Sequence, residues 1–145
     1  MEISLIEKAD KERYLVIQLV TIGWAIWFGS QIIQDLVSNI AVELIVVFIG
    51  FLGFILFLVG LIKQFKLKRK INSSRILKEA LANNEMYRLY ILKSTLVGFW
   101  TAIITTVCLL VTSTFYDISA SLACKIILFF CCLSYFIATL VYNKD

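Results

Sequence analysis

Two charged residues beside long apolar runs are the first candidates for chemistry. Glu43 follows eight residues after Asp35, and Lys125 follows eight residues after Asp117, so we expect both to lie at similar depths. An ion pair between Glu43 and Lys125 would link two membrane helices or line a polar cavity. The alternative is interfacial placement, with the lysine extending its ammonium group to water.

A second candidate is a pattern of small residues at intervals of 4, 3, 4, 3 and 4. On a helix this spacing forms one narrow face. This small-residue stripe consists of Ser94, Gly98, Thr101, Thr105, Cys108 and Thr112. Small residues let helix backbones approach closely, and hydroxyl groups can bond across helices. We interpret the stripe as a helix-packing surface; a mildly polar pathway in an oligomer is the alternative. Shorter counterparts are Gly53 and Gly60, and Cys124, Cys131 and Ala138.

The residue types needed for catalysis are scarce. There is no histidine, which removes the usual general base and the commonest metal ligand. The four cysteines fall in or beside apolar runs without a C-x-x-C spacing, which is typical of packing residues. We therefore expect no catalytic residues, no metal site and no cofactor, and we do not expect an enzyme.

The elements that must position these residues are apolar. Apolar residues make up 61% of the chain, and 81 of its 145 residues lie in four uncharged runs. Each run is close to the ~20 residues that cross a bilayer as a helix. We predict spans at about 14–33, 40–62, 91–113 and 119–142. The predicted fold is an all-α polytopic membrane protein of one domain, 1–145, with two antiparallel hairpins in a four-helix bundle.

The basic residues predict the orientation. Thirteen of the fourteen Lys and Arg residues lie in segments that alternate with the spans and so share one side. The positive-inside rule places both termini and residues 63–90 in the cytoplasm. Seven charges in the first thirteen residues, followed by a long apolar run, are unlike a secretory signal peptide, so we expect this segment to be retained.

A basic run follows the second predicted span, at Lys66, Lys68, Arg69 and Lys70. We interpret it as an anchor to anionic headgroups of the bilayer, where each basic residue contributes ~1 kcal/mol. The alternative is a docking surface for a cytoplasmic partner on residues 63–90. Since no aromatic residue is interleaved with the charges of the run from Lys66 to Lys70, we expect no nucleic-acid partner.

Short helices are predicted in the cytoplasmic segment. Ser73 or Ser74 can cap a helix that runs through Ala82. Asn84 can cap a second helix, and because no helix-breaking residue follows, we predict one continuous helix from about Glu85 to Ser113.

Aromatic residues mark the expected edges of the bilayer. We interpret Trp24, Trp27 and Phe28 as outer interfacial anchors. Tyr14, Tyr90 and Tyr142 are the expected inner ones.

The segment that opens the third span resembles a known family. It runs from Asn84 to Ser94 and leads into Gly98, Phe99 and Trp100. It is similar to small uncharacterised bacterial membrane proteins, classed as a domain of unknown function. These often carry an Asp-Glu-Arg start with a Lys-Ala or Lys-Ser eight residues after the Glu. Here Glu85 precedes Lys93 by eight residues, while Asn84 and Met86 replace the Asp and the Arg. The resemblance implies a four-span protein of the bacterial inner membrane and no particular activity.

These patterns favour a non-enzymatic membrane protein that acts through helix–helix association. It would form a homo-oligomer or bind a membrane partner, as a regulatory, accessory or immunity component. The alternative is a small oligomeric channel or transporter with the small-residue stripe as a polar lining.

Overall fold

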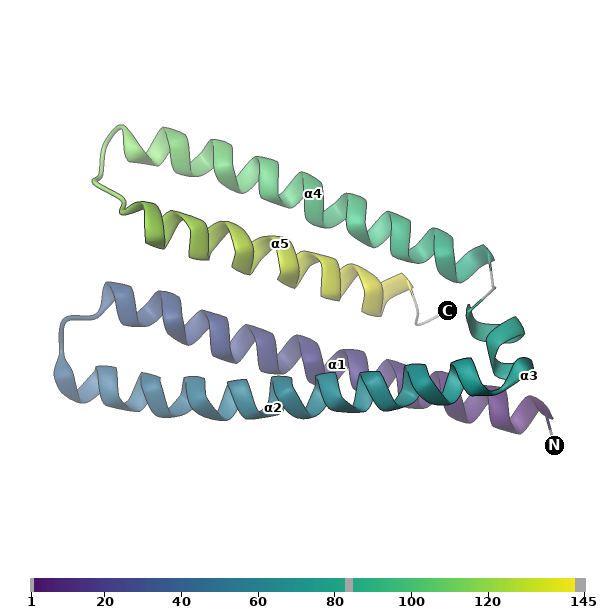
Figure 1. The fold of residues 1–145 in the computed structure, drawn as a ribbon. Helices are drawn as coiled ribbons and strands as arrows, with labels where there is room; N and C mark the ends of the chain where they lie inside the picture. The colour runs from purple at the N-terminus through teal and green to yellow at the C-terminus, as the bar shows by residue number, and fades with distance from the viewer. Residues whose placement is uncertain (1, 83–84, 143–145) are drawn as a thin grey trace.

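The structure is a computed structural model that describes residues 2–82 and 85–142, and these are helical almost throughout (Figure 1). Two short elements lie between the second and third of the four long helices. The elements in chain order are α1 (Glu2–Leu36), α2 (Ile40–Ser73), α3 (Arg75–Leu77), the π-helical turn η1 (Lys78–Ala82), α4 (Glu85–Ser113) and α5 (Ala120–Tyr142). No β-strand occurs in these two ranges.

Four helices are long and apolar enough to cross a membrane, which is the character of a multi-pass membrane protein. The predicted spans fall within these helices, except that Ser119 caps α5, its Oγ accepting a hydrogen bond from the Leu122 amide at 3.2 Å. At 1.5 Å per residue, α1 and α2 are about 50 Å long. Both therefore extend beyond a ~30 Å hydrocarbon layer.

α1 and α2 run antiparallel in close contact because glycines remove side chains between them (Figure 1). A Cβ atom on Gly53 would lie 2.6 Å from the backbone nitrogen of Trp27. A Cβ on Gly60 would lie 2.7 Å from Cγ2 of Val20. Both separations are too short for real atoms, so the predicted packing role of Gly53 and Gly60 is confirmed.

The four long helices are arranged as a row in the order α2, α1, α5, α4 (Figure 1). α1 contacts α2 on one side and α5 on the other, and α5 contacts α4. Within the described ranges, α2 has no extended contact with α4 or α5. The helical bundle is thus open, and α2 and α4 form its two edges.

A small apolar cluster joins the start of α1 and the end of α2 to α3 and η1. Leu77 and Ala9 are each only 1% exposed and contact each other among Ile6, Ile71 and Ala80. The predicted helix start at Ser74 is confirmed, because its Oγ accepts a hydrogen bond from the Leu77 amide at 3.4 Å. The helix continues to Ala82 as predicted, although its second half is π-helical.

The predicted continuous helix from Glu85 to Ser113 is confirmed as α4. Its predicted cap, Asn84, lies outside the described residues.

Candidate functional site

The best-defined polar contact between distant parts of the chain is an ion pair between α1 and α5. The Nζ atom of Lys125 lies 2.7 Å from Oδ2 of Asp35. Their side chains are 27% and 33% exposed, respectively, so neither is fully hydrated. Asp35 is in the last turn of α1, where the negative end of the helix dipole also attracts a cation. The pair joins the first half of the chain to the last helix.

The structure pairs Lys125 with Asp35 and not with the candidate partner, Glu43. The order of the helices explains the difference, because α1 lies between α5 and α2, which carries Glu43. Glu43 is exposed in the first turn of α2, where the positive end of the helix dipole favours an acidic residue. No ion pair of Glu43 occurs among the residues that the structure describes.

The small-residue stripe is covered at one end and open at the other. Ser94 is fully buried, and a Cβ on Gly98 would lie 3.2 Å from the carbonyl oxygen of Cys131 and 3.3 Å from Cβ of Tyr135. Thr101 and Thr105 are partly buried. Cys108 and Thr112 are exposed. The half of the stripe nearest the start of α4 therefore packs on α5, and the other half is exposed in the part of the chain that the structure describes.

The hydroxyl groups of the stripe bond within α4 and not across helices. Each donates to the carbonyl oxygen four residues earlier, at 2.8 to 2.9 Å; the donors are Ser94, Thr101, Thr105 and Thr112. The predicted cross-helix bonds are not formed among these residues. The nearest carbonyl of the same helix satisfies each hydroxyl without requiring a neighbour. Where the stripe packs on α5, it therefore does so through the small size of its side chains and not through hydrogen bonds.

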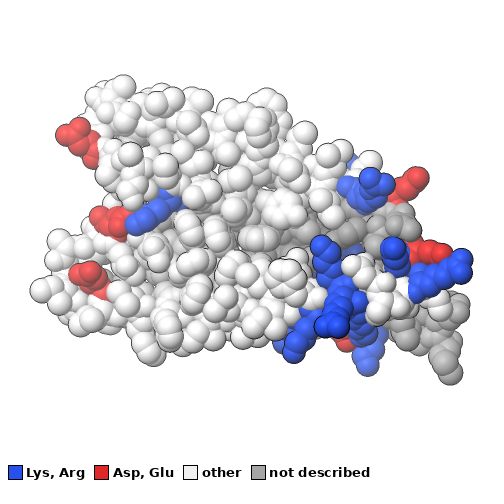
Figure 2. Space-filling model, viewed as in Figure 1, with Lys and Arg blue, Asp and Glu red and all other residues white. Residues whose placement is uncertain are grey.

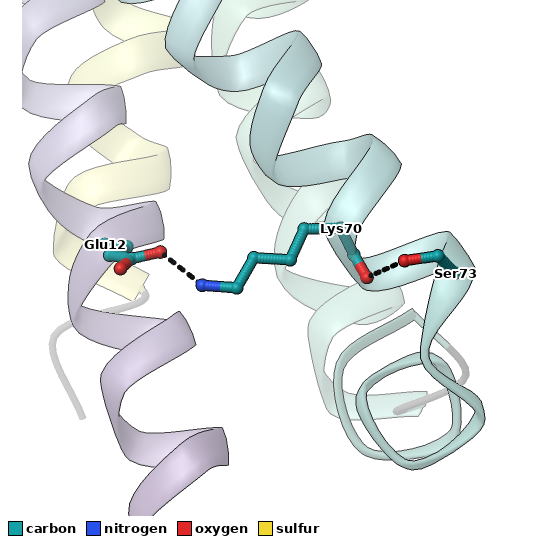
Figure 3. Close-up of polar contacts among 3 residues, drawn as sticks. All are labelled: Glu12, Lys70 and Ser73. Carbon is teal, nitrogen blue, oxygen red and sulfur yellow. Dashed lines mark hydrogen bonds and ion pairs between the residues drawn. The ribbon is translucent and has the colours of Figure 1, made fainter.

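The basic run lies on the last turns of α2, and its members point in different directions. Lys66, Lys68, Arg69 and Lys70 are all exposed, as expected for headgroup anchors. Lys70 alone among them forms a described ion pair, 3.1 Å from Oε2 of Glu12 on α1 (Figure 3). Figure 2 shows Lys and Arg side chains gathered at the end where α1 begins and α2 ends.

The aromatic residues of α1, predicted as outer interfacial anchors, contact other helices. Trp24 stacks on Phe28 with centroids 4.3 Å apart and lies 6.5 Å from the ring of Phe136 on α5. Trp27 lies 4.9 Å from Phe54 on α2. Trp24, Trp27 and Phe28 are three and four residues apart, a spacing that places them on one face of α1. α1 contacts α2 on one side and α5 on the other.

Tyr90 lies near the start of α4 and Tyr142 at the end of α5, and their rings stack with centroids 6.2 Å apart. These two predicted inner anchors therefore lie side by side.

Among the described residues, no group of three or more acidic or cysteine side chains is placed to hold a metal ion.

The chain matches no known protein-family profile, no curated protein and no solved structure. The functional interpretation of the candidate sites therefore rests on their geometry in this structure.

Proposed function

We propose that this protein is a non-enzymatic protein of the bacterial inner membrane that works by lateral association of its helices. The proposed topology is two antiparallel membrane hairpins, with both termini and residues 63–90 in the cytoplasm. The gathering of basic side chains at one end of the molecule supports this orientation (Figure 2). The role would be that of a regulatory, accessory or immunity component that binds a second copy or another membrane protein.

The observation that carries the proposal is the uncovered half of the small-residue stripe. Cys108 and Thr112 continue the face that packs on α5 through Ser94 and Gly98, yet both are exposed. Small side chains at a lipid-facing position give up van der Waals contacts that a closely approaching helix would supply. α4 is also at an edge of the row, so a partner helix can reach it without rearranging the four helices.

Native mass spectrometry of the protein extracted in mild detergent tests the proposal. We expect a complex of at least two chains, and we expect Thr112→Phe to weaken it, because a large ring blocks close approach of a helix. Leu110→Phe is the matched control, since Leu110 is 64% exposed and lies about 200° around the helix from Thr112. A strictly monomeric wild-type protein without a membrane partner would contradict the proposal.

The alternative function, a small oligomeric channel or transporter, has less support. A pore lined by the small-residue stripe requires its whole length to face the lumen, whereas Ser94 and Gly98 face α5. Ion flux in liposomes is the test, and a specific flux that Thr112→Phe blocks would favour the channel.

A further inference from the structure

A groove lies between α1 and α2 near the end of the molecule where the basic side chains gather. Its volume is about 590 Å³. This is within the ~300–1,000 Å³ typical of small-molecule sites. Its lining combines an apolar floor with a charged rim; the floor is Leu15, Val16, Leu19 and Leu67, and the rim is Glu12, Lys63, Lys66 and Lys70.

The floor is part of the contact between α1 and α2. Val16 and Leu67 are each 8% exposed, so they form the base of the groove, while Leu15 is 62% exposed and stands at its open side. An apolar surface of this kind suits a hydrocarbon chain and offers no hydrogen bond to a polar ligand.

The rim carries an excess of positive charge. Lys63, Lys66 and Lys70 recur at three- and four-residue intervals and so share one side of α2. Lys70 pairs with Glu12 across the groove and closes one end of it (Figure 3). Lys63 and Lys66 form no ion pair with any residue that the structure describes. Two uncompensated ammonium groups therefore stand above the apolar floor.

The position along the helices matches the boundary between headgroups and acyl chains. The uncharged run of α1 begins at Tyr14, between the lining residues Glu12 and Leu15, and that of α2 ends at Ile62, next to the lining residue Lys63. Its charged rim lies on the polar side of this boundary and most of its floor on the apolar side. A ligand that fits must therefore be anionic at one end and hydrocarbon at the other.

We propose that this groove binds one anionic phospholipid from the inner leaflet. The phosphate group would lie between Lys63 and Lys66, and the upper part of an acyl chain would run over Val16 and Leu19, into the uncharged run of α1. This site differs from general attraction between the basic run and the membrane, because Lys68 and Arg69 do not line the groove. It is also independent of the proposed association through α4.

Titration of the full-length protein in mild detergent with phosphatidylglycerol, followed by native mass spectrometry, tests the site. The Lys63→Gln/Lys66→Gln variant should bind the first phosphatidylglycerol about thirtyfold more weakly, since each lysine contributes ~1 kcal/mol. The control is Lys68→Gln/Arg69→Gln, which removes the same charge from exposed positions outside the groove. It should change binding of the first lipid by less than about threefold. Phosphatidylcholine should bind the wild type much more weakly than phosphatidylglycerol.

Several results would overturn the proposal. Equal weakening in the two double variants would reduce the effect to general electrostatic attraction. Unchanged binding in the groove variant, or equal binding of phosphatidylcholine, would remove the lysines from lipid recognition. Loss of a dimer in the groove variant, with lipid binding intact, would assign the groove to a second copy of the chain.

Discussion

The ammonium group of Lys125 lies 2.7 Å from the carboxylate of Asp35 and ties α5 to the end of α1. These residues are 90 positions apart in the sequence. Away from this end, contact between α1 and α5 includes aromatic side chains, with Trp24 near Phe136. The ion pair therefore fixes one end of the contact between the two halves of the chain.

A double-mutant cycle should detect this pair. Lys125→Met and Asp35→Asn should each lower the free energy of unfolding in detergent by about 0.5–1 kcal/mol, the usual size for a partly exposed pair. The double variant should lose little more than either single one, because both remove the same interaction. Glu43→Gln is the matched control, and its effect should add to that of Lys125→Met. Coupling of Lys125 to Glu43 instead of Asp35 would contradict the observed pairing.

The contact between α1 and α2 should be sensitive to a single methyl group. Gly53→Ala should lower the free energy of unfolding by about 1–3 kcal/mol, because its Cβ would meet the backbone of Trp27. Gly29→Ala is the control, since its Cβ would lie 3.7 Å from the Phe129 ring, an ordinary contact. Thermal unfolding of the two variants in the same detergent makes the comparison. Equal losses would show that helix approach at Gly53 is not limiting.

The cluster around Leu77 should control the order of the segment from Ser74 to Ala82. Leu77→Ala truncates the larger side chain of the buried pair Ala9 and Leu77. It should increase amide exchange in η1 at least tenfold, because burial of a leucine side chain contributes about 2 kcal/mol or more. Ile76→Ala, at a position that is 44% exposed, should have a much smaller effect. Hydrogen–deuterium exchange resolved by peptide measures both. Similar exchange in the two variants would mean that this cluster does not hold η1 in place.

Local features could be predicted from the sequence, and contacts between helices largely could not. α4 and the cap at Ser74 depend on apolar runs, capping residues and the absence of proline, all of which are local. The sequence predicts Lys125 as a candidate for an ion pair or for interfacial placement. Choosing Asp35 over Glu43 requires the order of the helices, which hydropathy alone does not specify.

The sequence alone does not predict the groove between α1 and α2, for the same reason. The sequence predicts Lys66 and Lys70 as headgroup anchors, but their convergence with Lys63 and Leu15 arises from the packing of two helices. Likewise, Trp24 and Trp27 have the composition of interfacial anchors. Only the contacts with Phe54 and Phe136 show that they pack between helices.

Photo-crosslinking from α4 in native membranes tests the proposed association most directly. A benzophenone probe is attached to Cys108 after Cys124, Cys131 and Cys132 are replaced by alanine. The control has Cys108→Ala as well and carries the probe on Leu110→Cys, an exposed position about 200° around the helix. The account predicts that the probe at Cys108 forms a protein adduct, with the same chain or a membrane partner, several times more efficiently than the probe at position 110. Equal adduct yields at the two positions, or labelling of lipid alone at both, would contradict it.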